Sequence, residues 1–351
     1  LSLFNASVIG TSSDGILAGE NLGIISGCYT SGSIINEANN FAITGGLVGL
    51  NYGVVQNSGA NVVVSAPQIG NSASSVFIGG LVGSMYNNGT IANSFAMGPV
   101  STNGSNVSIG GLVGYAINAG GNPSVTNSYA TGFVSNGSDP LTSTNMFGLA
   151  PTGVATITNS WWDSTSSGVS GSVTNAGNLV NAGTARATSS ALGSLNGLSD
   201  SAWSVAPGQY PYLKYLFPNG LQTVSGIAYK TDGSVAASTA AGGAVKVNLT
   251  LDGVKQTPVS TGANGYYYAA LPISIASDGT TRYPISSTGT NVLAWTDANS
   301  TYSSNAYNLN NFTSTSAGFN IGGSSVSQGF NLTSTGPTAI TLTTTSARYS
   351  D

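Results

Sequence analysis

The chain has 351 residues, only 5% of them charged, and its 49 glycines accompany abundant Ser, Thr and Asn. Its hydrophobic residues, 40% of the total, recur periodically, which predicts many short strands and tight turns rather than disorder. The first basic residue is Arg186, which argues against nucleic acid or anionic lipid as a partner of the preceding half. The absence of histidine excludes a Ser-His-Asp triad, and the lone Cys28 excludes an intrachain disulfide and a cysteine-based zinc site.

A four-residue block, Gly-Leu-Val-Gly, recurs through the first half of the chain. It occurs letter for letter at 46–49, 80–83 and 111–114, with a fainter copy at 15–19 and a degenerate one at 147–150. The copies begin roughly 30 to 37 residues apart, a period typical of solenoids, propellers and other repeat arrays.

Each copy is followed by a turn, a short strand, a second block of the form Asn-Ser-aromatic-Ala, and a further strand. Three short strands in about 30 residues match one coil of a parallel β-helix, which we expect over residues 1–172. Stacked coils would align equivalent side chains into core columns, and glycine or asparagine would occupy corners with positive φ. The chirality of parallel crossovers favours a right-handed coil. The residues predicted to form the repeat core are Leu47, Leu81, Leu112, Val48, Val82, Val113, Tyr29, Phe95, Tyr129 and Trp161.

Other aromatic residues fall outside these fixed positions and are candidates for contact with a ligand at the surface. Tyr52, Tyr86 and Tyr115 follow the Gly-Leu-Val-Gly block at a variable offset. Trp162 lies in the last, degenerate copy. Exposed aromatic rings can stack on sugars, although a purely structural place is the more common role of such residues.

The repeat resembles the GLUG motif of large secreted bacterial surface proteins and filamentous-haemagglutinin-like adhesins. The resemblance covers residues 15–168, and the second copy departs from it where Ser58-Gly59-Ala60 replaces the aromatic block. It implies a β-helical architecture and a secreted habitat, and it names no ligand.

Residues 173–220 break the period, and we expect them to cap and connect the β-helix. The stretch Arg186–Leu198 has helix-like apolar spacing. Trp203 and the sequence Gln209-Tyr210-Pro211-Tyr212-Leu213 supply apolar residues that would cover the exposed edge and core of the last coil. GLUG arrays often end similarly, with a Trp and a Gly-x-Tyr-Pro-x-Leu element.

Residues 221–335 alternate apolar and polar residues, as antiparallel strands do. Asp232-Gly233 and Asp252-Gly253 separate alternating runs, which is a strong hairpin signal, and the region predicts a β-sandwich. The order of motifs from Val224 to Pro272 resembles carboxypeptidase-regulatory-like and Cna-B-like domains. This resemblance implies an Ig-like or transthyretin-like sandwich that serves as an accessory or stalk module. Residues 336–351 are expected to form a linker or to begin a further module.

The acidic residues of the repeat region are the candidates for enzymatic chemistry. A glycosidase needs two carboxylates about 5 to 9.5 Å apart, and a polyuronide lyase needs a base together with a group that neutralises a carboxylate. None of the five acids recurs at a fixed place in the repeat, and Asp163 is interpreted as a turn or capping residue. We therefore expect no catalytic residue, cofactor or metal, with Ca²⁺ as the minor alternative. The five acids are Asp14, Glu20, Glu37, Asp139 and Asp163.

These observations predict a non-enzymatic, secreted protein of the bacterial cell surface that acts as an adhesin or an extracellular scaffold. Its partners would be extracellular carbohydrate or protein, or copies of itself, and no apolar run is long enough to span a membrane. The alternatives are a self-assembling subunit of an extracellular filament or surface layer and, less favoured, a β-helical carbohydrate-active enzyme. The chain begins at Leu1 within a partial repeat, so we expect it to be part of a longer polypeptide. We also expect the apolar edge at Leu1–Phe4 to be covered, by further coils or by a neighbouring subunit.

Overall fold

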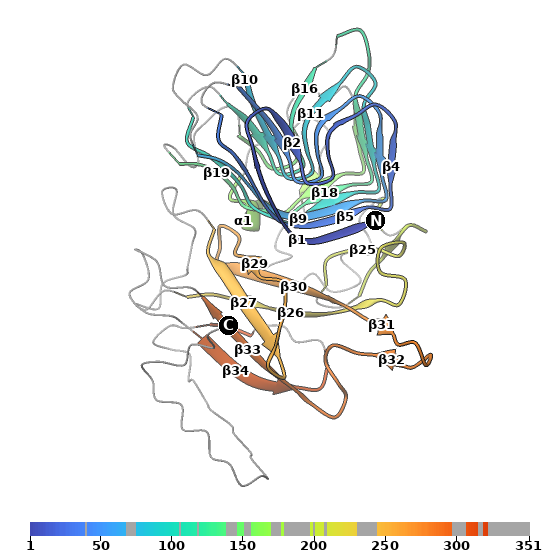
Figure 1. Cartoon of the computed structure of the whole chain (residues 1–351), viewed down its shortest axis with the longest axis vertical. Coiled ribbons are helices and arrows are strands. Elements are labelled where there is room, and N and C mark those ends of the chain that lie inside the picture. Colours follow the sequence, from blue (N-terminus) through green and yellow to red (C-terminus); the bar gives the residue numbers. More distant parts are fainter. Residues whose placement is uncertain are drawn as a thin grey trace.

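The computed structural model describes residues 1–38, 41–67, 75–104, 107–117, 119–137, 146–150, 156–169, 177–178, 197–198, 201–206, 209–229, 244–296, 307–314 and 319–321. This part of the chain is almost entirely β-structure and begins with a parallel β-solenoid of about four turns (Figure 1). Several predictions fall outside the described residues: most of the helix at Arg186–Leu198, Asp139, the turn at Asp232-Gly233 and the segment 336–351.

Four parallel sheets surround the core of the solenoid, and successive coils add strands to them (Figure 1). Sheet A contains β1 (Ser2–Gly10), β5 (Tyr29–Asn36), β9 (Gly59–Ala66), β13 (Phe95–Ala96), β14 (Val100–Thr102), β18 (Tyr129–Ala130), β19 (Val134–Asn136), β22 (Trp161–Trp162) and β23 (Gly177–Asn178). Sheet B contains β2 (Ser13–Gly15), β6 (Phe41–Gly45), β10 (Ser75–Gly79), β15 (Ser108–Gly110) and β20 (Met146–Phe147). Sheet C contains β3 (Ala18–Asn21), β7 (Val48–Asn51), β11 (Val82–Tyr86) and β16 (Val113–Ile117). Sheet D contains β4 (Ile24–Ser26), β8 (Val54–Gln56), β12 (Thr90–Ala92), β17 (Ser124–Thr126) and β21 (Thr156–Thr158).

The prediction of three strands per coil was wrong, because it missed sheet B. The strands of sheet B are short and run directly into the Gly-Leu-Val-Gly block, as β10 does at Gly79. A strand of this length carries too little alternation to be separated from the block that follows it.

Equivalent residues stack coil on coil, as the repeat predicted. The backbone N–H of Leu47 donates a hydrogen bond to the carbonyl oxygen of Leu81, and Leu81 donates to Leu112, each at 2.9 Å. At the corner formed by Cys28, Ser58, Ser94, Ser128 and Ser160, successive coils are 30, 36, 34 and 32 residues apart. The coils therefore differ in length, and their extra residues lie outside the stacked columns. The leucines and valines of the predicted columns are all 0% exposed: Leu47, Leu81, Leu112, Val48, Val82 and Val113.

Close backbone contacts, rather than positive φ, explain the glycines that open the Gly-Leu-Val-Gly block. A Cβ added at Gly80 would lie 2.1 Å from the carbonyl oxygen of Gly111 and 2.9 Å from the Cβ of Ala96 on sheet A. Gly46 and Gly111 lie against sheet A alanines in the same way, at 3.2 and 3.0 Å. None of these three glycines has a positive φ. The solenoid interior is therefore too thin at this corner for any side chain.

The Asn-Ser pair of the second block forms the corner between sheets D and A. Gly27 has a φ of 66° there in the first coil, and asparagine takes the place in later coils. The serine that follows holds two coils together: Ser94 Oγ donates to the carbonyl oxygen of Ala92 at 2.8 Å and accepts the N–H of Ser58 at 3.3 Å. Cys28 occupies the serine position in the first coil, where its backbone N–H donates to Ser58 Oγ at 3.1 Å. The corner asparagines, with φ between 46° and 50°, are Asn57, Asn93, Asn127 and Asn159.

The predicted aromatic column exists, but it lies on the outer face of sheet A rather than in the solenoid core. The rings of Tyr29 and Phe95 have centroids 6.3 Å apart, and those of Phe95 and Tyr129 are stacked at 5.5 Å. The next residues in their strands, Ala96 and Ala130, point inward and belong to the core. Gly59 lies between the first two rings, and its hydrogen faces the ring of Phe95, which explains why the second copy lacks an aromatic residue.

The described residues of the segment 198–221, which we call the covering segment, cover this column. The ring of Trp203 lies 5.4 Å from that of Tyr129, and the ring of Phe217 lies 6.0 Å from that of Tyr29. Tyr129 Oη donates a hydrogen bond to the carbonyl oxygen of Pro211 at 2.6 Å. Of the segment that was expected to cap the last coil, β23 extends sheet A beyond β22, and the described residues from 198 to 220 lie along the outer face of that sheet.

The rest of the described chain forms antiparallel strands beside sheet A (Figure 1). The turn predicted at Asp252-Gly253 is confirmed, with φ angles of 46° and 83° at its two residues. Val224 and Tyr267 of one strand pair share a buried cluster with Val247 and Ala294 of the larger sheet. The paired strands are β24 (Trp203–Ser204) with β25 (Tyr212–Leu213), β26 (Leu221–Ile227) with β30 (Tyr266–Pro272), and β31 (Ser274–Ile275) with β32 (Thr281–Arg282). The larger sheet contains β27 (Lys246–Leu251), β28 (Val254–Lys255), β29 (Val259–Ser260), β33 (Thr290–Thr296) and β34 (Tyr307–Phe312).

Helical structure contributes little to the described chain. Helix α1 (Ser164–Ser167) follows β22 in the chain. Within the described ranges, no helix has the length and apolar character needed to cross a membrane.

Candidate functional site

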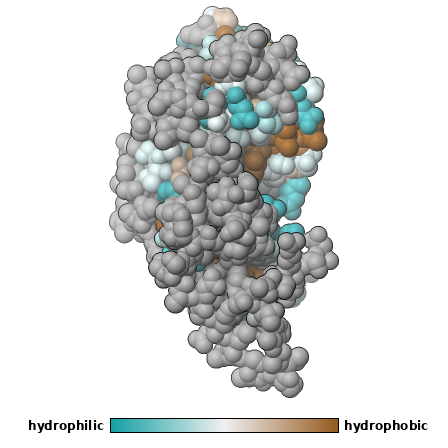
Figure 2. Space-filling model, turned by 90° about the vertical axis from the view of Figure 1, so that its left-hand side faces the viewer, coloured by the Kyte–Doolittle hydropathy of each residue, from teal (hydrophilic) through white to brown (hydrophobic). Residues whose placement is uncertain are grey.

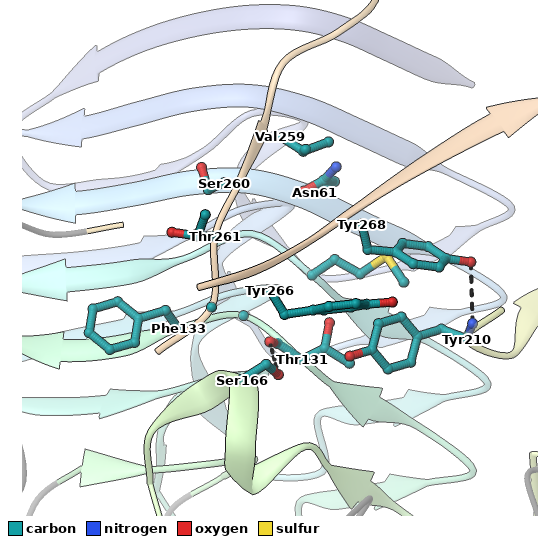
Figure 3. Close-up of a pocket in the computed structure, with 13 residues that line it drawn as sticks. Asn61, Thr131, Phe133, Ser166, Tyr210, Val259, Ser260, Thr261, Tyr266 and Tyr268 are labelled. Atoms are coloured by element: carbon teal, nitrogen blue, oxygen red, sulfur yellow. Dashed lines mark hydrogen bonds between the residues drawn. The ribbon is translucent and has the colours of Figure 1, made fainter. Parts of the chain in front are cut away.

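A small pocket lies between the outer face of sheet A and the antiparallel strands (Figure 3). Asn61 and Thr131 come from the solenoid, Tyr210 from the covering segment, and Tyr266 and Tyr268 from β30. Tyr268 Oη accepts the backbone N–H of Tyr210 at 3.2 Å. The pocket has a volume of about 30 Å³, which is room for little more than a water molecule. It is a packing gap at the junction and too small for a sugar.

Asp163 lies beside this junction, and both of its carboxylate oxygens are occupied. Oδ1 accepts the backbone N–H groups of Thr165 at 2.9 Å and Ser166 at 3.1 Å, so Asp163 caps α1. Oδ2 accepts the hydroxyl of Tyr210 at 2.9 Å. Burial raises the pKa of Asp163, and hydrogen bonds from Ser166, Tyr210 and Thr165 partly offset that rise. The capping interpretation is confirmed, and the same side chain ties the covering segment to the solenoid.

Two of the remaining described acids, Asp14 and Glu20, lie on successive strands of the first coil, β2 and β3. Asp14 Oδ2 accepts Asn36 Nδ2 at 2.6 Å, within the first turns of the solenoid. Glu20 lies on β3. Within the residues that the structure describes, no group of three or more His, Cys, Asp or Glu side chains could hold a metal ion.

Tyr52 and Tyr86 form a pair on successive coils, at the ends of β7 and β11. Their ring centroids are 5.3 Å apart with the planes 35° from parallel, and both side chains are partly exposed. Burial is the main cause that raises the pKa of Tyr86, and the nearby phenols of Tyr52 and Tyr115 add to it. The structure therefore brings together two of the predicted contact residues at the surface.

Tyr115 has a partner that sequence reasoning missed. Its ring stacks on that of Phe77, with centroids 4.2 Å apart and the planes 9° from parallel. Phe77 belongs to β10 of sheet B, and both side chains are partly exposed. Recognising the apolar triplet Val76-Phe77-Ile78 as a strand would have revealed this residue.

The prediction that Trp162 contacts a ligand is wrong. Trp162 is 3% exposed and belongs to the solenoid core, where its Nε1 donates to the carbonyl oxygen of Val169 at 3.1 Å. Trp161, predicted to be a core residue, pairs in register with Tyr129 and is partly exposed on the outer face. The two tryptophans alternate across the strand, and the sequence interpretation had exchanged their faces.

No protein-family model matches the chain, and no curated protein matches it. A solved structure described as a "putative immunoglobulin A1 protease from Bacteroides ovatus" is similar with a TM-score of 0.41 and 19% identity. That similarity covers 61% of this chain and 69% of the other chain. A TM-score this low supports no argument about activity.

Proposed function

We propose that this protein is a non-enzymatic, secreted bacterial surface protein that acts as an adhesin or extracellular scaffold. The Tyr52–Tyr86 pair carries the proposal, because it repeats an exposed aromatic ring from one coil to the next. Leu22 occupies the equivalent place in the first coil, because its neighbour Asn21 pairs in register with Asn51, the neighbour of Tyr52. The side chain of Leu22 is 76% exposed. An apolar and aromatic strip of this kind suits an extended ligand that lies along the solenoid.

The chemistry of the strip favours a neutral ligand. Aromatic faces stack on the C–H faces of sugars and on apolar side chains, and such contacts need no opposite charge. The chain carries no basic residue before Arg186, so little in the solenoid attracts an anion. The ligand class that we propose is therefore an extracellular neutral carbohydrate or protein surface.

The junction between the solenoid and the antiparallel strands supports a scaffold role. The cluster that joins them contains Phe95 and Tyr129 from sheet A and Trp203 from the covering segment, with Tyr266 packed against it. Interfaces built from buried aromatic residues hold two units in one orientation. The tyrosine strip would then sit at a fixed angle to whatever the other unit is attached to.

The finer architecture is part of the same proposal. It is a right-handed GLUG-type β-helix, a covering segment, and an Ig-like or transthyretin-like sandwich of the carboxypeptidase-regulatory or Cna-B kind. The shared buried cluster of β26, β30, β27 and β33 supports the sandwich. The recurring order of the blocks within this chain supports the GLUG assignment.

Binding to a panel of immobilised extracellular glycans and matrix proteins would test the proposed function. The double variant Tyr52→Ala/Tyr86→Ala should lose at least tenfold in affinity for any ligand that the unmodified chain binds. Tyr283→Ala is the matched control, since that tyrosine is 57% exposed and lies outside the solenoid. Equal affinity of the double variant and the control for every bound ligand would contradict the role of the strip.

A further inference from the structure

The outer faces of sheets B and C meet beside the Gly-Leu-Val-Gly corner. Phe77 lies between two core residues of β10, so its side chain points away from the core. Its ring stacks on that of Tyr115 from β16, with centroids 4.2 Å apart. Ser108 of sheet B also donates a hydrogen bond from its Oγ to the carbonyl oxygen of Gly114 at 2.6 Å. The two sheets therefore face one another here (β10 and β16 in Figure 1).

The three tyrosines of sheet C share its outer face. Core residues alternate with Tyr86 on β11 and with Tyr115 on β16, so both rings point away from the core. Tyr52 lies beside Tyr86 on the preceding coil, with ring centroids 5.3 Å apart. Burial raises the pKa of Tyr86, and the phenols of Tyr52 and Tyr115 add to that rise because they lie near it. The aromatic surface, as we call it, spans three successive coils and consists of Tyr52, Phe77, Tyr86 and Tyr115.

Exposed apolar side chains also occur elsewhere on the solenoid, as the brown patch in Figure 2 shows. Exposure alone therefore does not mark a binding site. The aromatic surface differs because sheet C contributes one tyrosine from each of three coils, and because a ring of sheet B contacts one of them.

We propose that the aromatic surface binds a linear, neutral glycan whose chain follows the solenoid axis. This inference rests on the proposed function and narrows its ligand class. Sugar units can pack their C–H faces on aromatic rings, and their hydroxyls can donate to and accept from phenol hydroxyls. The 5.3 Å between the rings of Tyr52 and Tyr86 is close to the length of one sugar unit in an extended glycan. Successive units therefore contact successive coils.

The area of the surface argues against a protein ligand. An aromatic side chain has about 150–250 Å² of surface, so four rings that are each less than half exposed offer under about 500 Å². A stable contact between two proteins buries about 800 Å² on each partner. A glycan chain is narrow enough to be held by the smaller area.

The charges favour a neutral glycan over an acidic one. Glu20 pairs in register with Leu50, which shares the outer face of sheet C with Tyr52, so a carboxylate borders the aromatic surface. The solenoid residues 1–172 contain no Lys or Arg that could hold an acidic sugar. An anionic chain would be repelled at this border, whereas neutral hydroxyls can donate hydrogen bonds to the carboxylate.

Titration calorimetry of the full chain with neutral, linear oligosaccharides tests the ligand class. The probes are glucose, galactose, mannose, xylose and N-acetylglucosamine oligomers of one to six units. Because three coils each contribute a tyrosine, affinity within a bound series should rise at least tenfold from one unit to about three and then level off. Oligomers of galacturonic acid should bind at least tenfold more weakly than the bound neutral series. The inference is overturned if no neutral series binds, if affinity does not grow beyond one unit, or if the acidic oligomers bind equally well.

Substitutions at the sheet B wall test whether both walls hold the glycan. Phe77→Ala and Tyr115→Ala should each weaken binding of the trisaccharide at least fivefold, whereas Tyr283→Ala, at a residue that is 57% exposed outside the solenoid, should leave it unchanged. Should either alanine variant melt early, Tyr115→Phe keeps the stacked ring, removes the hydroxyl and should still bind about two- to fivefold more weakly. Unchanged affinity in all three variants overturns the inference.

The outcomes also separate this inference from the proposed function on which it rests. A protein ligand that is lost in Tyr52→Ala/Tyr86→Ala, with no binding of neutral oligosaccharides, would leave the proposed function standing and overturn the assignment of a glycan. A trisaccharide that binds equally well to the double variant and to the Phe77 and Tyr115 variants would contradict both.

Discussion

Two aromatic columns run along the solenoid, and they differ in what covers them. Tyr29, Phe95 and Tyr129 on sheet A lie under the described residues of the covering segment, with Tyr129 0% exposed. Tyr52 and Tyr86 at the ends of their sheet C strands are partly exposed. One repeat thus produces both a column that the chain uses to fix its own second unit and a column that is open to a partner. Burial of a ring, rather than its place in the repeat, separates the aromatic residues that hold the chain together from those that we propose to contact a ligand.

Loss of a coil would remove both columns together, so the largest effect is expected from Leu81→Asp. Leu81 is 0% exposed, and the variant places an unpaired charge in the core. We expect the neighbouring coils at least to unfold, as seen by circular dichroism during thermal melting. Leu22→Asp, at a residue that is 76% exposed, should melt like the unmodified chain. Full thermal stability of Leu81→Asp would refute the stacked leucine column.

Truncating one ring in each column should show that the covered column contributes more to the free energy of unfolding than the exposed column does. Tyr129→Ala removes a buried ring and a hydrogen bond to Pro211, and should lower the free energy of unfolding by about 3–5 kcal/mol. Tyr86→Ala removes a partly exposed ring and should cost about 0.5 kcal/mol or less. Urea unfolding measures both values. Losses of similar size would mean that the two columns are equally structural.

Alkaline pH should act on the covered column. Burial raises the pKa of Tyr29 to about 12, with a hydrogen bond from Asn61 in partial opposition, and burial raises that of Tyr129 well above its ordinary value. The folded chain therefore holds more protons than the unfolded chain above about pH 10. This contribution to stability is complete below about pH 10 and is lost as pH rises through the folded-state pKa values.

Unfolding free energies measured from pH 9 to pH 12 check this expectation. Tyr129→Phe should flatten the alkaline decline, because the variant has no phenol to ionise at that site. If the unfolding free energy of Tyr129→Phe fell with pH as steeply as that of the unmodified chain, the covered column would not be the cause of the loss of stability at alkaline pH.

Salt should have the smallest effect. A ligand held by Tyr52 and Tyr86 makes stacking contacts, so its affinity should change less than about twofold between low and moderate salt. Titration calorimetry at two salt concentrations measures this. A steep loss of affinity with salt would mean that ionic contacts, rather than stacking on the two tyrosines, hold the ligand.

The sequence predicted features that depend on the repeat or on residues close together in the chain. The leucine and valine columns, the hairpin at Asp252-Gly253 and the capping role of Asp163 all followed from local patterns. Stacking and turn chemistry act between residues that are close in sequence or equivalent in the repeat. Such features leave a direct trace in the order of the residues.

The features that failed depend on the direction of a side chain or on distant contacts. Trp161 and Trp162 form a strand of two residues, too short to show which face is inside. The aromatic column was expected in the core, because nothing in the repeat reveals that Trp203 and Phe217 would cover its outer face. The close contact of Gly80 with Ala96 likewise joins two corners that are far apart in the coil.

Hydroxyl-radical footprinting of individual tyrosines, with and without a bound ligand, tests the contrast between the columns most directly. We predict that Tyr52 and Tyr86 are oxidised rapidly in the free protein and are protected when a ligand binds, whereas Tyr129 and Tyr210 react slowly in both states. Oxidation of Tyr129 at the rate of Tyr86, or a bound ligand that leaves Tyr52 and Tyr86 unprotected, would contradict this assignment of a closed and an open column.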